Sequence, residues 1–135
     1  MIRTYIDAGV LIAAARGEAS IALKALDILD DPNRDFASSI FVKLEVLPKA
    51  VHNKNAAESE FYETFFAGVT IWSESFDSLV QGAFNEACDS GLGALDALHV
   101  VGAVYADAEQ LVTTEGLDKP IHRTHLIKVV SIAPH

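Results

Sequence analysis

Apolar residues along the chain follow two different spacings. Short runs of β-branched and aromatic residues indicate strands, whereas longer segments with apolar residues three or four positions apart indicate amphipathic helices. Residues 3–6 form the first short run, and residues 10–15 form a helix that an Arg-Gly pair ends. A second helix is predicted from about residue 18 to residue 30, where an Asp-Pro-Asn sequence ends it.

The rest of the chain continues this alternation of strands and helices. The predicted elements are a strand at 36–38, helices from about 40 to 49–54 and at 56–66, a strand at 69–72, helices from about 73–75 to 90 and from 94 to about 108, and strands at 110–113 and 128–132. Pro48 lies inside the third helix, and we expect it to kink or end that helix because proline lacks a backbone donor. Strands separated by helices predict an α/β fold with a five-stranded, mainly parallel sheet that is covered on both faces.

Length and composition indicate a single domain over residues 1–135. Half of the residues (50%) are hydrophobic and 21% are charged, an ordinary globular balance that excludes wholesale disorder. No apolar run reaches the ~18 residues that a membrane span needs, and the short, acid-terminated start is unlike a signal peptide, so no membrane partner is expected. Cys88 is the only cysteine and cannot form an internal disulfide; we expect it to be buried and inert, in a cytoplasmic protein.

The net charge of the chain limits the kinds of molecule that it can bind. Ten Lys and Arg residues against nineteen Asp and Glu residues give a formal net charge of −9. A protein that held nucleic acid by bulk charge would show the opposite balance, because neutralisation of phosphates drives such binding. The acidic excess excludes a simple basic-patch binder. It is compatible with a protein that gathers divalent cations at an acidic site and contacts phosphate through them.

Four acidic residues are predicted to lie where a ligand would bind. In open parallel sheets the functional crevice lies beyond the carboxyl ends of the strands. Asp7 ends the first strand, and Glu115 lies two residues past the fourth. Glu45 and Asp96 each stand in a mostly apolar helical segment, a position where a carboxylate needs a partner because burying an unpaired charge is costly.

A cluster of these four acids would require cations or protons. Two unit charges about 5 Å apart repel by about 3 kcal/mol at an effective dielectric of 20. Such a cluster either keeps protons at neutral pH or binds cations. Carboxylate oxygens suit Mg²⁺ or Mn²⁺ better than zinc, which prefers cysteine and histidine. We therefore expect a divalent metal site.

The acids stand in segments that resemble the PIN-domain ribonucleases, most closely the VapC-like toxins of bacterial toxin–antitoxin pairs. The matching segments are Tyr-Ile-Asp-Ala-Gly-Val-Leu-Ile at 5–12, Ser-Ile-Phe-Val-Lys-Leu-Glu-Val-Leu at 39–47, Leu-Gly-Ala-Leu-Asp-Ala-Leu-His at 92–99 and Leu-Val-Thr-Thr-Glu at 111–115. Their order and spacing cover the whole chain, which makes the likeness more specific than any single motif.

The resemblance implies a three-layer α/β/α sandwich and hydrolysis of RNA phosphodiester bonds by an endoribonuclease. Its four catalytic and metal-binding acids would be Asp7, Glu45, Asp96 and Glu115, with Mg²⁺ or Mn²⁺ as the cofactor. The resemblance also implies a homodimer and a cognate antitoxin protein that presents a basic side chain and an apolar segment. The family usually carries Ser, Thr or Asn where this chain has Gly9, and Asp where it has Glu115.

Further residues near these acids are candidates for substrate binding. Thr113 and Thr114 lie at the end of the fourth strand and can hydrogen-bond a ligand or the RNA. Lys119 and Arg123 are the only cations near Glu115 in the sequence and are candidates for contact with RNA phosphate. His99 follows Asp96 by three residues, and a packed structural histidine is the expected role.

Two other functions fit part of the sequence. A phospho-accepting receiver domain shares the layout, the acid after the first strand and a Lys-Pro pair at 119–120, but it needs a second acid near the first strand and an aspartate after the third. The other alternative is a catalytically weakened PIN domain that binds proteins, which the departures at Gly9 and Glu115 favour. A metal-dependent nuclease should be stabilised by Mg²⁺ or Mn²⁺, and a melting temperature that does not respond to either metal would exclude it.

Overall fold

A five-stranded parallel sheet forms the centre of the molecule in the computed structural model, which describes residues 1–17 and 19–134. The strands are β1 (Ile2–Ile6), β2 (Arg34–Ser39), β3 (Ile71–Ser73), β4 (Gln110–Thr113) and β5 (Lys128–Ser131). Their order across the sheet is β3-β2-β1-β4-β5, and every neighbouring pair is parallel. The predicted α/β class and five-stranded, mainly parallel sheet are confirmed.

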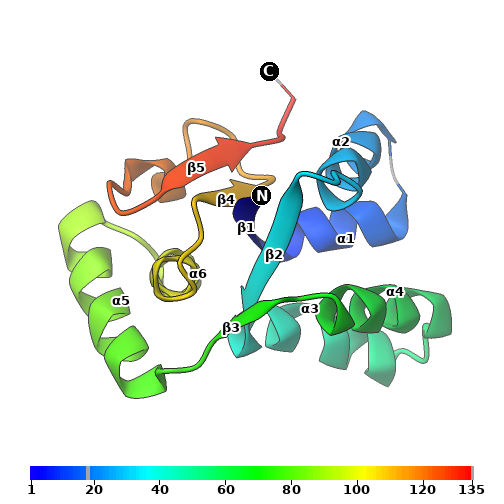
Figure 1. The fold of residues 1–135 in the computed structure, drawn as a ribbon, viewed down its shortest axis with the longest axis horizontal. Helices are drawn as coiled ribbons and strands as arrows, with labels where there is room; N and C mark the ends of the chain where they lie inside the picture. Colours follow the sequence, from blue (N-terminus) through cyan, green and yellow to red (C-terminus); the bar gives the residue numbers. More distant parts are fainter. Residues whose placement is uncertain (18, 135) are drawn as a thin grey trace.

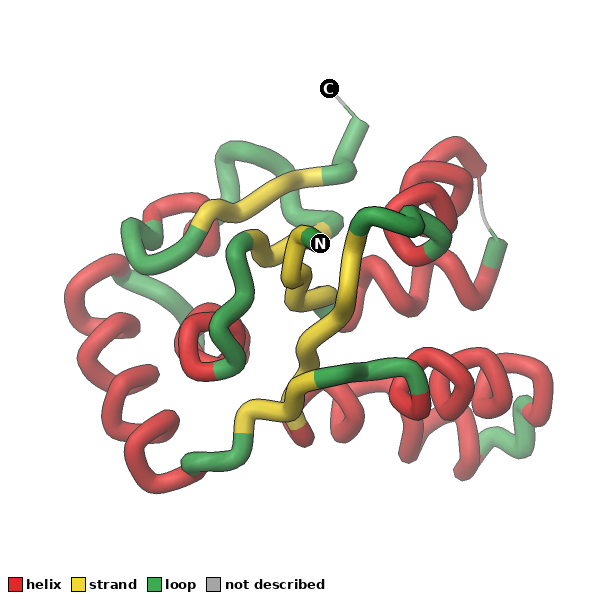
Figure 2. The backbone as a smooth tube through the Cα atoms, viewed as in Figure 1, coloured by secondary structure: helices red, strands yellow, loops and turns green. Residues whose placement is uncertain are grey.

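Helices cover both faces of this sheet. They are α1 (Ala8–Arg16), α2 (Ala19–Leu29), α3 (Ile40–His52), α4 (Ala56–Ala67), α5 (Phe76–Ser90) and α6 (Ala94–Tyr105), with a 3₁₀ turn, η1 (Pro120–Arg123). Helices α1 to α4 lie on one side and α5 and α6 on the other, so the strands form a middle layer (Figures 1 and 2). Among the residues that the structure describes, no helix combines the length and the apolar character needed to cross a membrane. The predicted start of the second helix at residue 18 lies outside the described residues.

The handedness of parallel connections explains which helices lie on which face. The chain moves in one direction from β1 to β2 to β3, and then returns past β1 to β4 and β5. Right-handed crossovers taken in opposite directions place their helices on opposite faces. A receiver domain would have the order 2-1-3-4-5, so the observed order excludes that alternative.

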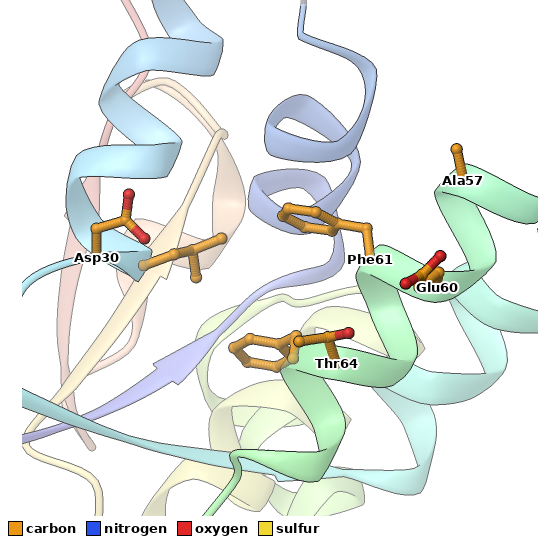
Figure 3. Close-up of a pocket in the computed structure, with 7 residues that line it drawn as sticks. Asp30, Ala57, Glu60, Phe61 and Thr64 are labelled. Atoms are coloured by element: carbon orange, nitrogen blue, oxygen red, sulfur yellow. The ribbon is translucent and has the colours of Figure 1, made fainter.

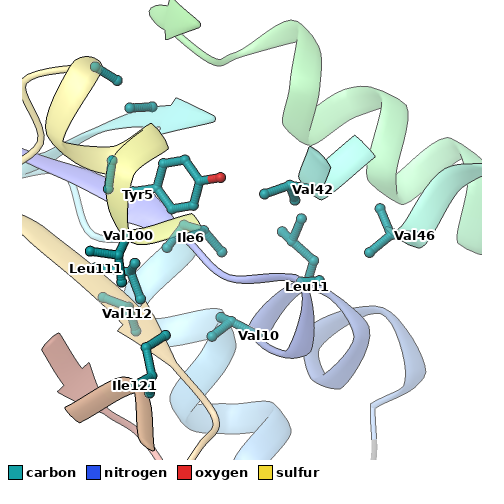
Figure 4. Close-up of a cluster of buried hydrophobic side chains, with 14 of the residues drawn as sticks. Tyr5, Ile6, Val10, Leu11, Val42, Val46, Val100, Leu111, Val112 and Ile121 are labelled. Atoms are coloured by element: carbon teal, nitrogen blue, oxygen red, sulfur yellow. The ribbon is translucent and has the colours of Figure 1, made fainter. Parts of the chain in front are cut away.

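The central strands supply the hydrophobic core. Tyr5 and Ile6 on β1 are completely buried, as is Leu111 on the neighbouring β4. Leu11 on α1 and Val42 on α3 pack against them from one face (Figure 4). Burial on both faces explains why these strands are almost continuously apolar instead of alternating.

Helix α3 does not end at Pro48 but continues to His52, inside the predicted end range of residues 49–54. The kink expected at Pro48 stays a prediction. The hydrogen bond that Pro48 cannot donate would go to the carbonyl of Leu44, and because both residues are exposed, water can take its place. Cys88, expected to be buried, is exposed on α5.

Candidate metal centre and active site

The strand order defines where a ligand site should lie. Connections leave β1 and β4 toward opposite edges of the sheet, which makes the carboxyl ends of these two strands the topological switch point. Ile6 pairs with Val112 in register, and the backbone N–H of Asp7 donates to the carbonyl of Val112 at 3.0 Å. Asp7 and the residues after Thr113 therefore lie next to each other, although about a hundred residues separate them in sequence.

Asp7 is held in place by two hydrogen bonds. It is the N-cap of α1, and its Oδ1 accepts from the backbone N–H of Ala8 at 2.7 Å. Its Oδ2 accepts from the hydroxyl of Thr113 at 2.8 Å. A carboxylate at a helix N-terminus is favoured by the helix dipole. The side chain is nearly buried, and no Lys or Arg among the described residues forms an ion pair with it.

Asp96 lies close to the other three predicted acids. It stands in the first turn of α6 and is partly buried. Burial raises the pKa of its carboxyl, and the negative charges of Asp7, Glu115 and Glu45 raise it further, whereas His99 lowers it. The fold therefore brings acids from four separate segments within electrostatic reach of one another.

Glu45 is bound by a buried hydrogen-bond chain that the sequence analysis did not identify. His99 Nε2 bonds to Glu45 Oε1 and lies 4.0 Å from Asp7 Oδ1. His99 Nδ1 lies 2.9 Å from the hydroxyl of Tyr5, which in turn lies 2.7 Å from the hydroxyl of Ser39. His99 is 2% exposed, so the expectation that it is packed is confirmed, but it also positions Glu45. Two features of the sequence could have indicated this hydrogen-bond chain: His99 lies one helical turn after Asp96, and Tyr5 lies two residues before Asp7.

The segment after β4 adds one acid and two hydroxyl groups. Thr113 is completely buried, and besides donating to Asp7 it accepts from the backbone N–H of Glu115 at 3.1 Å. The carbonyl of Glu115 accepts from Ser131 and His122, at 2.7 and 3.0 Å. Glu115 itself is exposed. Its backbone is thus fixed while its carboxylate remains accessible to solvent.

Thr114 occupies the space that Gly9 leaves open. A Cβ atom on residue 9 would lie 2.3 Å from the Thr114 hydroxyl oxygen, which is far inside normal contact distance. The hydroxyl of Thr114 therefore stands where a serine or threonine side chain at position 9 would begin. The departure at Gly9 does not remove a hydroxyl from this edge of the sheet, because Thr114, the first residue after β4, supplies one.

Neither of the two predicted phosphate-binding cations forms an ion pair with an acid of the described residues. Arg123 Nη1 donates to the carbonyl of Gly91 at 3.4 Å, at the C-terminus of α5. Lys119 is exposed at the start of η1. Contact with RNA stays a prediction for both residues.

The donor chemistry of the site suits a hard divalent cation. Asp7, Glu45, Asp96 and Glu115 all offer carboxylate oxygens, the ligands that Mg²⁺ and Mn²⁺ prefer. Within the described residues, however, no three Asp, Glu, His or Cys side chains are arranged so that they could already hold one ion. Glu45 contacts His99 instead of the other acids. The residues present fit a metal by type, and side-chain movement among these acids would be needed to bring three of them onto one ion.

Solved structures share this PIN-like α/β fold. One is VapBC2 from Rickettsia felis bound to a DNA fragment from its promoter, with a TM-score of 0.72 and 18% identity over 96% of this chain and 98% of that chain. Another is VapBC-1 from nontypeable Haemophilus influenzae, with a TM-score of 0.68 and 18% identity over 96% and 98%. A third is DNA-bound VapBC from Salmonella typhimurium, with a TM-score of 0.67 and 15% identity over 97% of this chain and 98% of that chain.

These likenesses establish the fold of the chain. The scan against family models gives no match, and the search of curated proteins finds no similar sequence. At such low identity, function has to be argued from the site, because one fold hosts many activities.

Proposed function

We propose that this protein is a Mg²⁺- or Mn²⁺-dependent endoribonuclease and the toxin of a toxin–antitoxin pair. The observation that carries the proposal is the convergence of four acids at one edge of the sheet: His99 Nε2 contacts Glu45 and lies 4.0 Å from Asp7 Oδ1, and Asp7, Glu115 and Glu45 are near enough to raise the pKa of Asp96. Within the described part of the chain, no Lys or Arg forms an ion pair with any of these four acids. Carboxylates gathered at a topological switch point without a Lys or Arg partner favour binding of a divalent cation.

The four acids would act together as metal ligands in the proposed reaction. The carboxylates of Asp7, Glu45, Asp96 and Glu115 would hold the metal, with Asp7 kept in position by Thr113 and the N-terminus of α1. When bound, Mg²⁺ supplies charge neutralisation at the phosphate and activation of water. In the hydrolysis, a water oxygen bonds to phosphorus as the bond to the leaving ribose oxygen breaks. Thr114, Lys119 and Arg123 remain candidates for contact with the RNA, as does Thr113, which is buried and donates to Asp7.

Cleavage of single-stranded RNA with Mg²⁺, with Mn²⁺ and with EDTA tests the proposal. Asp7→Asn should abolish metal-dependent cleavage, while the fold is kept because asparagine caps helices as well as aspartate does. Asp118→Asn is the matched control, since it makes the same change at an exposed acid between β4 and η1. Cleavage that persists in EDTA, or its absence with both metals, would contradict the nuclease function. A melting temperature that does not respond to metal would favour a protein-binding role.

An antitoxin partner follows from the same proposal, and the known complexes VapBC2 and VapBC-1 support it. A groove of about 480 Å³ lies between α2 and α4, lined by Leu29, Phe61 and Phe65 and edged by Asp30 and Glu60 (Figure 3). Apolar walls with acidic edges fit an apolar segment that carries basic side chains, such as the antitoxin would present.

The groove can be tested with a substitution on its exposed wall. Ala57→Arg introduces bulk and positive charge into the groove and should weaken binding of the antitoxin that this proposal expects. Ala67→Arg makes the same change at an exposed position of α4 outside the groove and should leave binding unchanged. Equal binding by both variants would show that the partner docks elsewhere.

A homodimer is also part of the proposal. Phe76, Val80 and Phe84 lie four residues apart along α5 and are 47%, 54% and 66% exposed, which gives this helix an apolar stripe. Phe84→Glu should shift the protein toward the monomer in light scattering after gel filtration, whereas Asn85→Glu should not. A wild-type protein that elutes as a monomer at high concentration would contradict the dimer.

A further inference from the structure

A second polar cavity lies beside the candidate metal centre, between α1, α3 and α4. Its volume is about 240 Å³, and its polar lining includes Arg16, Glu45, Lys49, Asn53, Glu58 and Tyr62. Glu45 belongs both to this cavity and to the group of four acids, so the two sites share a wall. Arg16 and Lys49 have no role in holding a metal, and the cavity therefore needs an explanation of its own.

Three lining residues form a polar stripe along α3. Glu45, Lys49 and Asn53 follow one another at intervals of four residues, which places them on one face of the helix. At 1.5 Å per residue the stripe extends about 12 Å from the acids. Lys49 is exposed and forms no ion pair with the described residues. The stripe thus changes from negative to positive within one helical turn.

The second acid of the cavity is already neutralised by its neighbours. Glu58 Oε1 accepts from the Tyr62 hydroxyl at 2.5 Å and lies 3.6 Å from Arg16 Nε. Glu58 Oε2 accepts from the side-chain amide of Asn55 at 3.0 Å. The ion pair uses only Nε of Arg16, so the terminal nitrogens of this exposed guanidinium can donate to another oxyanion.

We propose that this cavity binds the RNA backbone, with Lys49 and Arg16 contacting the phosphate of a nucleotide next to the one that is cleaved. The inference rests on the proposed nuclease function. RNA whose scissile phosphate reached the four acids would continue past Glu45, where the stripe along α3 becomes positive. Guanidinium and ammonium groups are the side chains that bind phosphate. In a chain of net charge −9, two of its ten basic residues stand at this one cavity.

Binding of RNA at different salt concentrations tests the inference. A short fluorescein-labelled single-stranded RNA of mixed sequence is titrated with the full-length protein in EDTA, so that binding is measured without cleavage. Loss of one phosphate contact should make the slope of log K against log salt shallower by about 0.7. Over a fourfold range of salt concentration, the affinity of the variant should therefore fall about 2.6-fold less than the affinity of the wild type. Lys49→Gln and Arg16→Gln should each show this change, and the double variant should show about twice the change in slope.

Lys128→Gln is the matched control, because it removes the same charge at the start of β5, on the opposite edge of the sheet. It should bind RNA with the wild-type slope. Melting temperatures of all variants show that the fold is kept. An equal decrease in slope for Lys128→Gln and Lys49→Gln would mean that only net charge matters, and the inference would be wrong.

The outcomes also separate this inference from the proposed function. If the wild-type protein cleaves RNA with Mg²⁺ but Lys49→Gln and Arg16→Gln keep its salt slope, the nuclease function stands and the cavity does not bind RNA. If both variants lower the slope but the wild-type protein cleaves no RNA with either metal, the cavity binds RNA and the nuclease proposal fails. Weaker antitoxin binding with an unchanged RNA slope would assign the cavity to an acidic side chain of the partner and overturn the inference.

Discussion

Gly9 is required by the close approach of Thr114, and Gly9→Ala tests this directly. The added Cβ would lie 2.3 Å from the Thr114 hydroxyl oxygen and 3.4 Å from its Cβ. Because non-bonded heavy atoms rest about 3.5 Å apart, the overlap with the hydroxyl is about 1 Å. Overpacking of this kind costs about 1–3 kcal/mol. For a chain of 135 residues this corresponds to a fall in melting temperature of roughly 3–10 °C.

A double-mutant cycle shows whether the hydroxyl is the cause. Removing it with Thr114→Ala leaves the Cβ contact of 3.4 Å as the nearest, so Gly9→Ala in that background should regain most of the lost stability. We expect an interaction energy of about 1–2 kcal/mol from urea unfolding of the four proteins in EDTA. Gly68→Ala is the control, since its Cβ would meet nothing closer than 3.5 Å. Equal stability of Gly9→Ala and wild type, or no recovery in the double variant, would refute the reasoning.

Three further predictions concern the acids and the hydrogen-bond chain. Mg²⁺ or Mn²⁺ should raise the melting temperature, with about 2.7 kcal/mol of added stability at 100 times Kd, and a flat response would count against the metal site. Asp96→Asn should stabilise the metal-free protein at pH 7. Because the pKa of Asp96 is raised in the folded protein, ionisation of this carboxyl opposes folding above pH 3.8, the usual pKa of the group. The added stability of Asp96→Asn in urea unfolding should therefore shrink as the pH falls toward 3.8. Tyr5→Phe should lower the free energy of unfolding by about 1–3 kcal/mol, measured in the same way, because Ser39 and His99 lose a buried partner.

The fold could be predicted because the strands on both sides of the switch point are strongly apolar. The predicted strand at 110–113 agrees with β4 residue for residue. Strand β2 begins earlier than predicted, at Arg34, whose guanidinium donates to Thr4 on the neighbouring β1 and to Gln110 on β4, one strand further, both at 2.9 Å. A charged residue that is satisfied by contacts across the sheet has no signature in the local pattern of apolar positions. Strand ends of this kind are therefore missed.

The candidate site could be predicted in its residue types but not in its contacts. Acids that end a strand or interrupt an apolar helix stand out locally, which is how Asp7 and Asp96 were selected. The contact between His99 and Glu45 joins residues 54 positions apart, and the contact between Thr113 and Asp7 joins residues 106 positions apart. Such pairs depend on the relative placement of α3, α6 and β4, which no local spacing specifies.

The way Asp7 is held also explains why its charge remains available. Its two oxygens are fixed by neutral donors, the N–H of Ala8 and the hydroxyl of Thr113, and not by a basic side chain. Neutral hydrogen bonds orient a carboxylate but leave most of its charge uncompensated, whereas an arginine would have cancelled it. Because β1 and β4 send their connections to opposite edges, the site stays open at this point. The fold thus holds the Asp7 carboxylate in a fixed orientation, near enough to Asp96 to raise the pKa of that second acid.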